Sequence, residues 1–286
     1  MIFMKVVTSV KEMQEFSALM KSKRKSIGFV PTMGFLHEGH ASLIRKSVQE
    51  NDSTVASIFV NPLQFAPNED FNSYPRDFER DKKICLKEKV DVLFYPNEKE
   101  IYPNGAEKAE FREVSKFTAI LEGKTRPVHF RGVTTVVSKL FDIVMPNKAY
   151  FGKKDFQQAK IIDLLAKEFN YNVEIIKCPI VREKDGLALS SRNVYLNENE
   201  RKQAPILFQS LLLGKKLIEE GEKNPGKVIQ RIKEKINSMN SAEIDYVEIL
   251  DLNSFEKSKE INSSVLILLA VYFGKTRLID NLGVLF

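Results

Sequence analysis

The sequence predicts an α/β protein with a parallel sheet covered by helices on both faces, followed by a smaller α+β domain. In the first part of the chain, short apolar runs alternate with segments of helical spacing. Alternation of strand and helix is typical of a parallel sheet with helices on both faces. After about residue 193 the order changes to helices and then strands. We therefore predict two domains, residues 1–184 and 185–286.

The elements of the first domain follow from apolar periodicity and from start and stop residues. Ser9 is followed by Glu12 three residues on, which is the pattern of a capping box at a helix start. β-branched runs that end at a turn or a proline predict buried strands. The expected helices are residues 9–23, 37–51, 76–89, 132–144 and 155–169, and the expected strands are 26–34, 53–62, 90–96, 148–152 and 172–178.

The second domain is expected to hold two helices and then three strands. The sequence Asn224–Pro225–Gly226 marks the loop between the helices. The apolar run SSVLILLAVYFG is too short to cross a membrane and suits a buried strand. The expected helices are 198–221 and 225–239, and the expected strands are 244–251, 263–274 and 277–286.

Composition excludes several classes of protein. The net charge of +6 comes from 44 basic and 38 acidic residues spread along the chain, so no basic stripe for nucleic acid is expected. Cys85 and Cys178 lie far apart and predict two buried free thiols rather than a disulfide or metal site. Free thiols predict the cytoplasm as the compartment, and neither a signal peptide nor a membrane span is expected.

The stretch FVPTMGFLHEGH, residues 29–40, holds two of the three histidines of the chain. It runs from the end of an expected strand to the start of a helix, which is where open α/β sheets bind ligands. A helix N-terminus offers unpaired N–H groups and a partial positive charge, which suit a phosphate. His37 and His40 are three residues apart and would share a face. The alternative is a pair of surface histidines on a turn.

Three later segments place polar residues after strands or in loops. Asn61 and Gln64 are neutral amides that can bind a hydroxyl or a carboxylate, although Asn61–Pro62 can also merely end the strand. Lys154 can bind a phosphate as a point charge. Ser190, Ser191 and Arg192 offer hydroxyls and a permanent charge, but such a string also occurs in ordinary loops. His129 alone would be structural.

Taken together, these segments resemble the pantothenate synthetase family, also called pantoate–β-alanine ligases. HEGH fits the HxGH motif of the nucleotidyltransferase superfamily, and the longer PTMGFLHEGH is similar to the family's own motif. Five later segments resemble further family segments in the same order: FVNPLQF, DFNSYPRDFERD, RPVHFRGV, FGKKDFQQAKII and VREKDGLALSSRNVYL. Two positions depart from the pattern: Lys153 replaces a glutamate and Leu189 replaces a methionine. We expect both to be tolerated, since Leu conserves apolar volume and residue 153 should point outward.

The resemblance implies a Rossmann-like first domain and a second domain that acts as a lid. It implies an ATP-dependent condensation of pantoate with β-alanine through an acyl adenylate, with Mg²⁺ carried by ATP. It also implies a homodimer. It implies catalytic roles for His40, His37 and Lys154, with His40 as the proton donor. The ATP site would comprise Met33, Gly34, Phe35, Leu36, His37, Glu38, Gly39, His40, Gly152, Lys153, Lys154, Asp155, Val181, Leu189, Ser190, Ser191 and Arg192. Pantoate would contact Pro31, Thr32, Met33, Asn61, Gln64, His129 and Gln158, and β-alanine would contact Gln64.

Two other functions stay open at this point. Another HxGH enzyme could attach AMP or CMP to a phosphorylated substrate, but it would need cationic contacts where Asn61 and Gln64 are neutral, which favours a hydroxy acid. An RNA-binding module of synthetase type would need a strong basic stripe, which a net charge of +6 over this chain does not supply.

Overall fold

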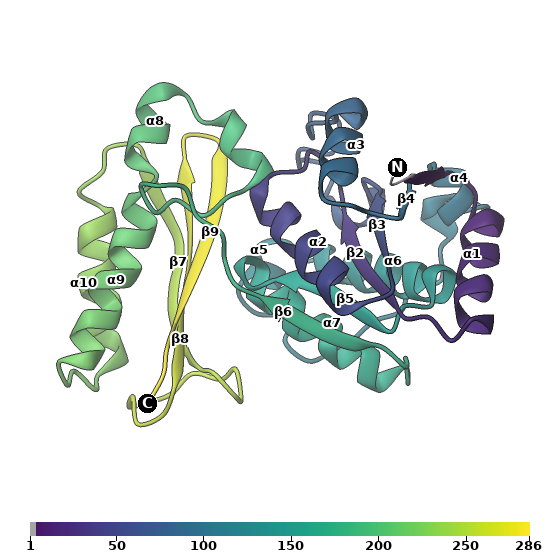
Figure 1. The fold of residues 1–286 in the computed structure, drawn as a ribbon. Helices are drawn as coiled ribbons and strands as arrows, with labels where there is room; N and C mark the ends of the chain where they lie inside the picture. Colours follow the sequence, from purple (N-terminus) through teal and green to yellow (C-terminus); the bar gives the residue numbers. More distant parts are fainter. Residues whose placement is uncertain (1–3) are drawn as a thin grey trace. The chain divides into compact units, whose positions relative to one another are not determined.

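The computed structural model describes residues 4–286, and the chain divides into two compact units, Met1–Pro179 and Ile180–Phe286 (Figure 1). The expected boundary after residue 184 lies five residues beyond the observed one (184 against 179). The intervening segment belongs to the second unit because Arg182 there forms a bidentate ion pair with Asp280, at 2.6 and 2.9 Å. Each unit is described below by itself.

The first unit is built on a six-stranded, fully parallel sheet. Five strands were expected, and β5 has the predicted bounds, while the three-residue strand β1 was not predicted because so short a run carries no periodicity. Along the sheet the order is β1-β4-β3-β2-β5-β6. The strands are β1 Lys5–Val7, β2 Ile27–Thr32, β3 Ser53–Ile58, β4 Val92–Phe94, β5 Lys148–Gly152 and β6 Glu174–Cys178.

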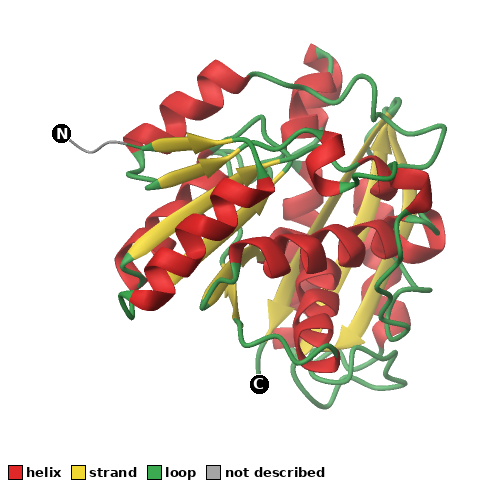
Figure 2. Cartoon of the chain, turned by 90° about the vertical axis from the view of Figure 1, so that its right-hand side faces the viewer, coloured by secondary structure: helices red, strands yellow, loops and turns green. Residues whose placement is uncertain are grey.

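Helices cover both faces of this sheet, as predicted (Figure 2). Successive strand residues point to opposite faces. Phe29 packs in a core with α1, α6 and α7, whereas Val30 packs in a second core with α2 and α3. The α-helices are α1 Val10–Ser22, α2 Glu38–Glu50, α3 Phe78–Lys87, α4 Glu98–Ile101, α5 Glu122–Thr125, α6 His129–Val144 and α7 Phe156–Glu168.

The sheet has a switch point between β2 and β5. From β2 the chain proceeds to β3 and β4 on one side, and from β5 to β6 on the other. Where two such neighbouring connections diverge, a crevice opens beyond the carboxyl ends of the strands. The loop after β2 contains His37, and the segment after β5 contains Lys154. The fold therefore brings the two predicted phosphate-binding segments to one edge.

The second unit packs helices against a three-stranded antiparallel sheet of order β7-β8-β9. The single helix expected over residues 198–221 is wrong: Pro205 lacks an N–H donor and divides it into two helices. The other expected helix and all three strands are confirmed. The elements are α8 Glu198–Gln203, α9 Ile206–Glu219, α10 Pro225–Ile236, β7 Ala242–Asp251, β8 Val265–Phe273 and β9 Thr276–Val284.

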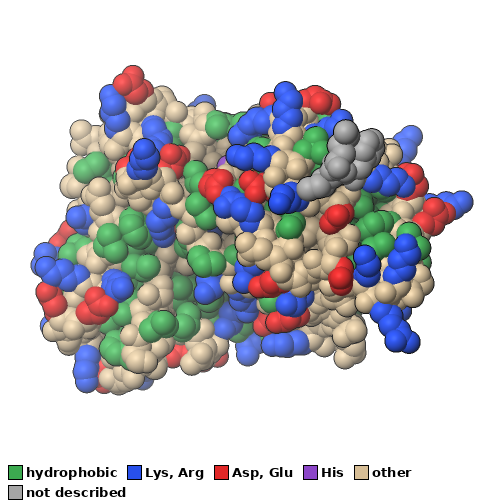
Figure 3. All heavy atoms as spheres, viewed as in Figure 1, with side chains coloured by type: hydrophobic (Ala, Val, Ile, Leu, Met, Phe, Trp, Pro, Cys, Tyr) green, Lys and Arg blue, Asp and Glu red, His purple; other side chains and the backbone are tan. Residues whose placement is uncertain are grey.

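Surface charge and the thiols agree with the composition. On the face seen in Figure 3, basic and acidic side chains are interspersed. Cys85 and Cys178 are free and buried, as predicted. No helix within residues 4–286 combines the length and apolar character needed to cross a membrane.

Candidate active site

Two histidines form the cap of helix α2. His37 is the N-cap residue, and its Nδ1 accepts a hydrogen bond from the Gly39 N–H at 3.1 Å. His40 Nδ1 accepts from the His37 N–H at 3.3 Å, and the ring centroids are 4.1 Å apart. Because each Nδ1 accepts, a neutral ring carries its proton on Nε2. Both imidazoles therefore present an Nε2–H donor.

The surroundings keep both imidazoles neutral at pH 7. Burial, with a contribution from the positive charge of Lys154, lowers the pKa of His37 to about 4. Burial lowers the pKa of His40 well below its ordinary value, and His37 and Lys154 lower it further. A neutral imidazole beside a lysine can donate hydrogen bonds to an anion without itself being an acid near pH 7. This pair is thus arranged as donors beside a fixed positive charge.

The turn that leads to His37 is held by a buried carboxylate. Gly34 and Phe35 have left-handed backbones, with φ of +83° and +49°. Asp81, on α3, is 1% exposed and accepts the Phe35 N–H and the Leu36 N–H, both at 2.7 Å. Burial raises the pKa of Asp81, and the two backbone hydrogen bonds oppose that rise.

Asp81 is a site residue that the sequence reasoning missed. The available signal was its position four residues before Cys85, on the buried face of an amphipathic helix. A carboxylate at such a position needs buried donors. The partners themselves lie 45 and 46 residues away in sequence and could not be read from periodicity.

The segment after β5 supplies a cation and a carboxylate. Lys153–Asp155 form a single 3-10 turn, and Lys154 Nζ lies 3.3 Å from Asp155 Oδ1. The Lys154 side chain is 20% exposed, whereas Lys153 is exposed, as expected for a residue that points outward. Lys154 acts electrostatically on both histidines, so the two predicted phosphate-binding segments do meet.

The end of β3 brings a fixed amide pair to the same edge. Gln64 is 6% exposed; its Nε2 donates to Met33 Sδ at 2.9 Å, and its Oε1 accepts from Asn61 Nδ2 at 3.2 Å. Asn61 also donates to the Gly132 carbonyl at 3.0 Å and accepts from the Tyr102 hydroxyl at 2.8 Å. The amide of Asn61 is therefore fully engaged by protein groups.

His129, the first residue of α6, is held from both sides of its ring. Its Nδ1 donates to the Gln64 carbonyl at 3.1 Å, because that oxygen can only accept. The Arg126 guanidinium lies 3.4 Å from His129 Nε2. Arg126 also pairs with Glu69, with 2.9 Å between Arg126 Nε and Glu69 Oε1. His129 thus carries its proton on Nδ1, unlike the two cap histidines.

In α7 the two glutamines have different roles. Gln157 is buried and donates to the carbonyls of Phe117 and Ile120, at 2.7 and 2.8 Å. Gln158, the residue expected to bind pantoate, is only half-buried. Gln157 therefore fixes the preceding loop, and Gln158 keeps the accessibility that a ligand contact requires.

The predicted loop of the second unit is an ordered turn within that unit. Leu189 N–H donates to the Val181 carbonyl at 3.0 Å, and Ser190 Oγ accepts from the Arg192 N–H at 3.3 Å. A 3-10 helix follows over Ser191–Tyr195, with Ser191 buried and Arg192 half-buried. The hydroxyls and the guanidinium that the sequence singled out are thus gathered on one turn.

Comparison with known proteins agrees with this geometry. The family model described as pantoate-beta-alanine ligase matches residues 5–283. The chain is 53% identical to a pantothenate synthetase of Caldicellulosiruptor bescii over 98% of this chain and 99% of the relative. It is 50% identical to one of Thermotoga neapolitana over 97% and 99%.

Solved structures give the same result. A pantothenate synthetase from Thermus thermophilus superposes with a TM-score of 0.92 at 41% identity, covering 98% of this chain and 99% of that one. A pantoate-beta-alanine ligase from Francisella tularensis, complexed with beta-gamma ATP and beta-alanine, gives a TM-score of 0.78 at 38% identity over 98% and 97%. Since both the family match and the structural match extend over nearly the whole chain, this protein belongs to the pantoate–β-alanine ligase family.

Proposed function

We propose that this enzyme condenses pantoate with β-alanine to give pantothenate, using ATP and releasing AMP and pyrophosphate. The family match supports the overall reaction. The observation in the structure that carries it is the pair of neutral Nε2–H donors, His37 and His40, beside Lys154 at the switch point of the sheet. Two donors and a cation around one space suit a phosphate that must accept further negative charge.

In the first step a pantoate carboxylate oxygen attacks the α-phosphorus of ATP. The new P–O bond forms as the bond to pyrophosphate breaks, and charge accumulates on the phosphate oxygens. His37 and His40 donate hydrogen bonds to these oxygens, and Lys154 compensates the charge. The resemblance gave His40 the role of proton donor; its strongly lowered pKa favours a hydrogen bond rather than full proton transfer.

We propose that pantoate is bound by Gln64, Gln158 and Met33. Asn61 and His129 would act by positioning: Asn61 orients the Gln64 side chain, and His129 anchors the Gln64 backbone. A fixed amide costs less entropy when the ligand arrives. In the second step the β-alanine amine attacks the acyl carbon, the C–N bond forms, and the bond to AMP breaks; the amine proton passes to solvent.

The remaining parts of the proposal come from the resemblance. Mg²⁺ would enter with the ATP phosphates and neutralise part of their charge, because among residues 4–286 no three His, Cys, Asp or Glu side chains form a metal cage. Val181, Leu189 and the turn Ser190–Arg192 would bind ATP, and the second unit would shield the acyl adenylate from water. Homodimerisation and a cytoplasmic location stay predictions.

An AMP-release assay with each substrate omitted in turn tests the reaction. We expect AMP to appear only when ATP, pantoate and β-alanine are all present, and pyrophosphate to appear with ATP and pantoate alone in a single turnover. Pyrophosphate release that needs a sugar phosphate or nucleotide phosphate in place of pantoate, with AMP retained in the product, would identify a nucleotidyltransferase instead and refute the proposal. RNA binding without turnover would refute it as well.

A further inference from the structure

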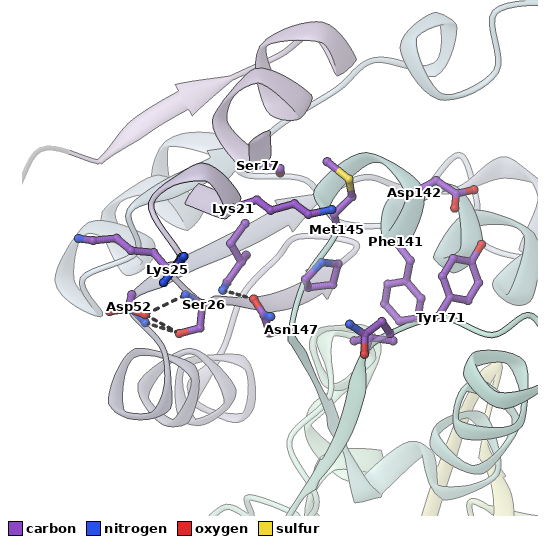
Figure 4. A pocket seen from close by; sticks show the side chains of 15 residues that line it. Ser17, Lys21, Lys25, Ser26, Asp52, Phe141, Asp142, Met145, Asn147 and Tyr171 are labelled. Carbon is purple, nitrogen blue, oxygen red and sulfur yellow. Dashed lines mark hydrogen bonds between the residues drawn. The ribbon is translucent and has the colours of Figure 1, made fainter. Parts of the chain in front are cut away.

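A pocket lies at the amino-terminal edge of the parallel sheet, opposite the edge that holds the candidate active site. It has a volume of about 600 Å³ and is lined where three strands begin, at Ile27, at Asp52 and at Asn147 (Figure 4). Its size falls in the range of small-molecule sites. The histidines and Lys154 follow the other ends of β2 and β5, so this pocket is separate from the ATP site.

One wall of the pocket is basic. Lys21 lies in the last turn of α1, and Arg24 and Lys25 follow that helix; none of the three forms an ion pair or a side-chain hydrogen bond within residues 4–286. Two acidic residues also line the pocket. Asp52 accepts from the N–H and the hydroxyl of Ser26, both at 2.8 Å, and Asp142 pairs with Arg112 at 3.0 Å. Because Asp142 is paired with Arg112, the pocket holds three cations against one carboxylate, that of Asp52, on which the charge of Lys25 acts.

The other wall is aromatic and apolar. Phe141 and Tyr171 stand side by side in Figure 4, with their ring centroids 5.4 Å apart in an edge-on contact. Met145, 44% exposed, lies above them. Both Met145 and Arg24 have left-handed backbones, with φ of +48° and +54°. Met145 is the C-cap residue of α6 and Arg24 follows the C-cap residue of α1, so both left-handed backbones belong to helix ends that border the pocket.

We propose that this pocket binds a small aromatic phosphate. The flat body would lie against Met145 and against Tyr171, which packs on the buried Phe141, and the phosphate would meet Lys21, Arg24 and Lys25. A phosphate is favoured because its charge at neutral pH of about −1.5 to −2 matches several cations better than one carboxylate does. The binding is independent of the condensation reaction and does not rest on the function proposed for the other edge.

Titration calorimetry of the full chain with 1-naphthyl phosphate, in saturating ATP and Mg²⁺, tests this site. We expect saturable binding of one equivalent, with 1-naphthol and inorganic phosphate each binding more weakly. The double variant Lys21→Gln with Arg24→Gln should weaken binding at least about tenfold, which corresponds to about 1.4 kcal/mol. The matched control is Lys11→Gln with Lys23→Gln, which removes the same charge from α1 and its C-cap position, outside the pocket, and should leave binding unchanged.

Three outcomes would overturn the proposal. Binding that vanishes as ATP is added belongs to the nucleotide site. An equal loss of affinity in both double variants reflects the net charge of the protein and not the pocket. If the pocket variant changes the molecular mass seen by light scattering but not the binding of 1-naphthyl phosphate, the pocket is instead a contact between two copies of the chain. Melting temperatures of both variants, measured in parallel, show that each is folded.

Discussion

Asp81→Asn tests whether the turn before His37 is part of the catalytic machinery. The carboxylate accepts two backbone N–H groups, from Phe35 and Leu36, both at 2.7 Å. An asparagine of the same shape has one acceptor oxygen, so its NH₂ group faces one of these N–H donors. Leaving one buried donor without an acceptor costs about 1–3 kcal/mol. Phe35 has φ of +49°, so the turn depends on this anchor.

We expect the cost to appear mainly in the rate of adenylate formation. If displacement of the His37 and His40 donors raises the activation free energy by about 2 kcal/mol, the rate falls roughly 30-fold. The assay is pantoate-dependent exchange of labelled pyrophosphate into ATP, with kcat and KM determined separately. Because the turn contacts no substrate through Asp81 itself, kcat should fall while the KM for β-alanine in the full reaction stays constant.

The chain offers a matched control in Asp91→Asn. Asp91 Oδ2 accepts a single backbone N–H, from Thr54 at 2.7 Å, at the start of β3 and away from the catalytic edge. An asparagine can keep that bond through its own oxygen. Normal exchange in a folded Asp81→Asn protein, or an equal loss in the two variants, would refute the reasoning.

Four other predictions follow from the site. His40→Ala should lower pyrophosphate exchange by about 10²–10³-fold with the fold retained in circular dichroism, and full activity would exclude His40 from the mechanism. Because the folded pKa of His37 is about 4 against an ordinary 6.5, its contribution to the free energy of unfolding is fully present above pH 6.5 and is lost as the pH falls toward 4; urea titrations should show this slope, reduced in His37→Gln. Tyr102→Phe removes the hydrogen bond to Asn61 Oδ1 and should cost about 1 kcal/mol of stability and raise the KM for pantoate, whereas an unchanged KM would show that Asn61 does not position Gln64. Lys153→Glu, at an exposed position, should leave kcat within about twofold, since surface charges contribute little.

The fold was largely predictable because the sequence patterns that mark its helices and strands lie within each element. The strand Lys148–Gly152 was predicted with its observed bounds, since a short apolar run between Pro146 and the glycine has no other reading. Ser9 caps α1 through the Glu12 N–H, as the capping box indicated. The failures were also local: β1 has three residues, and the effect of Pro205 within an otherwise helical pattern was overlooked.

The site was predictable only in its outline. The sequence placed His37, His40 and Lys154 near one another because parallel strands bring their carboxyl ends to one edge. It could not show that Asn61 is buried against Tyr102, or that His129 is held by the Gln64 carbonyl, because those contacts join segments that are far apart in the sequence. Whether a polar residue touches a ligand or orients one that does depends on which of its atoms are already bonded. Periodicity does not contain that information.

The use of histidine at the helix cap lets His37 and His40 serve both the fold and the chemistry that we propose. Asp, Ser, Thr and Asn are the usual N-cap residues. An aspartate at position 37 would cap α2 equally well but would place a negative charge against the phosphate. The short side chain of a serine would accept the backbone N–H but could not reach as far toward a phosphate. Imidazole accepts the backbone N–H on Nδ1 and keeps a donor on Nε2, at the far side of a rigid ring. The hydrogen bond that starts the helix therefore also fixes the tautomer that our proposed phosphate contact requires, and burial beside Lys154 keeps both rings neutral.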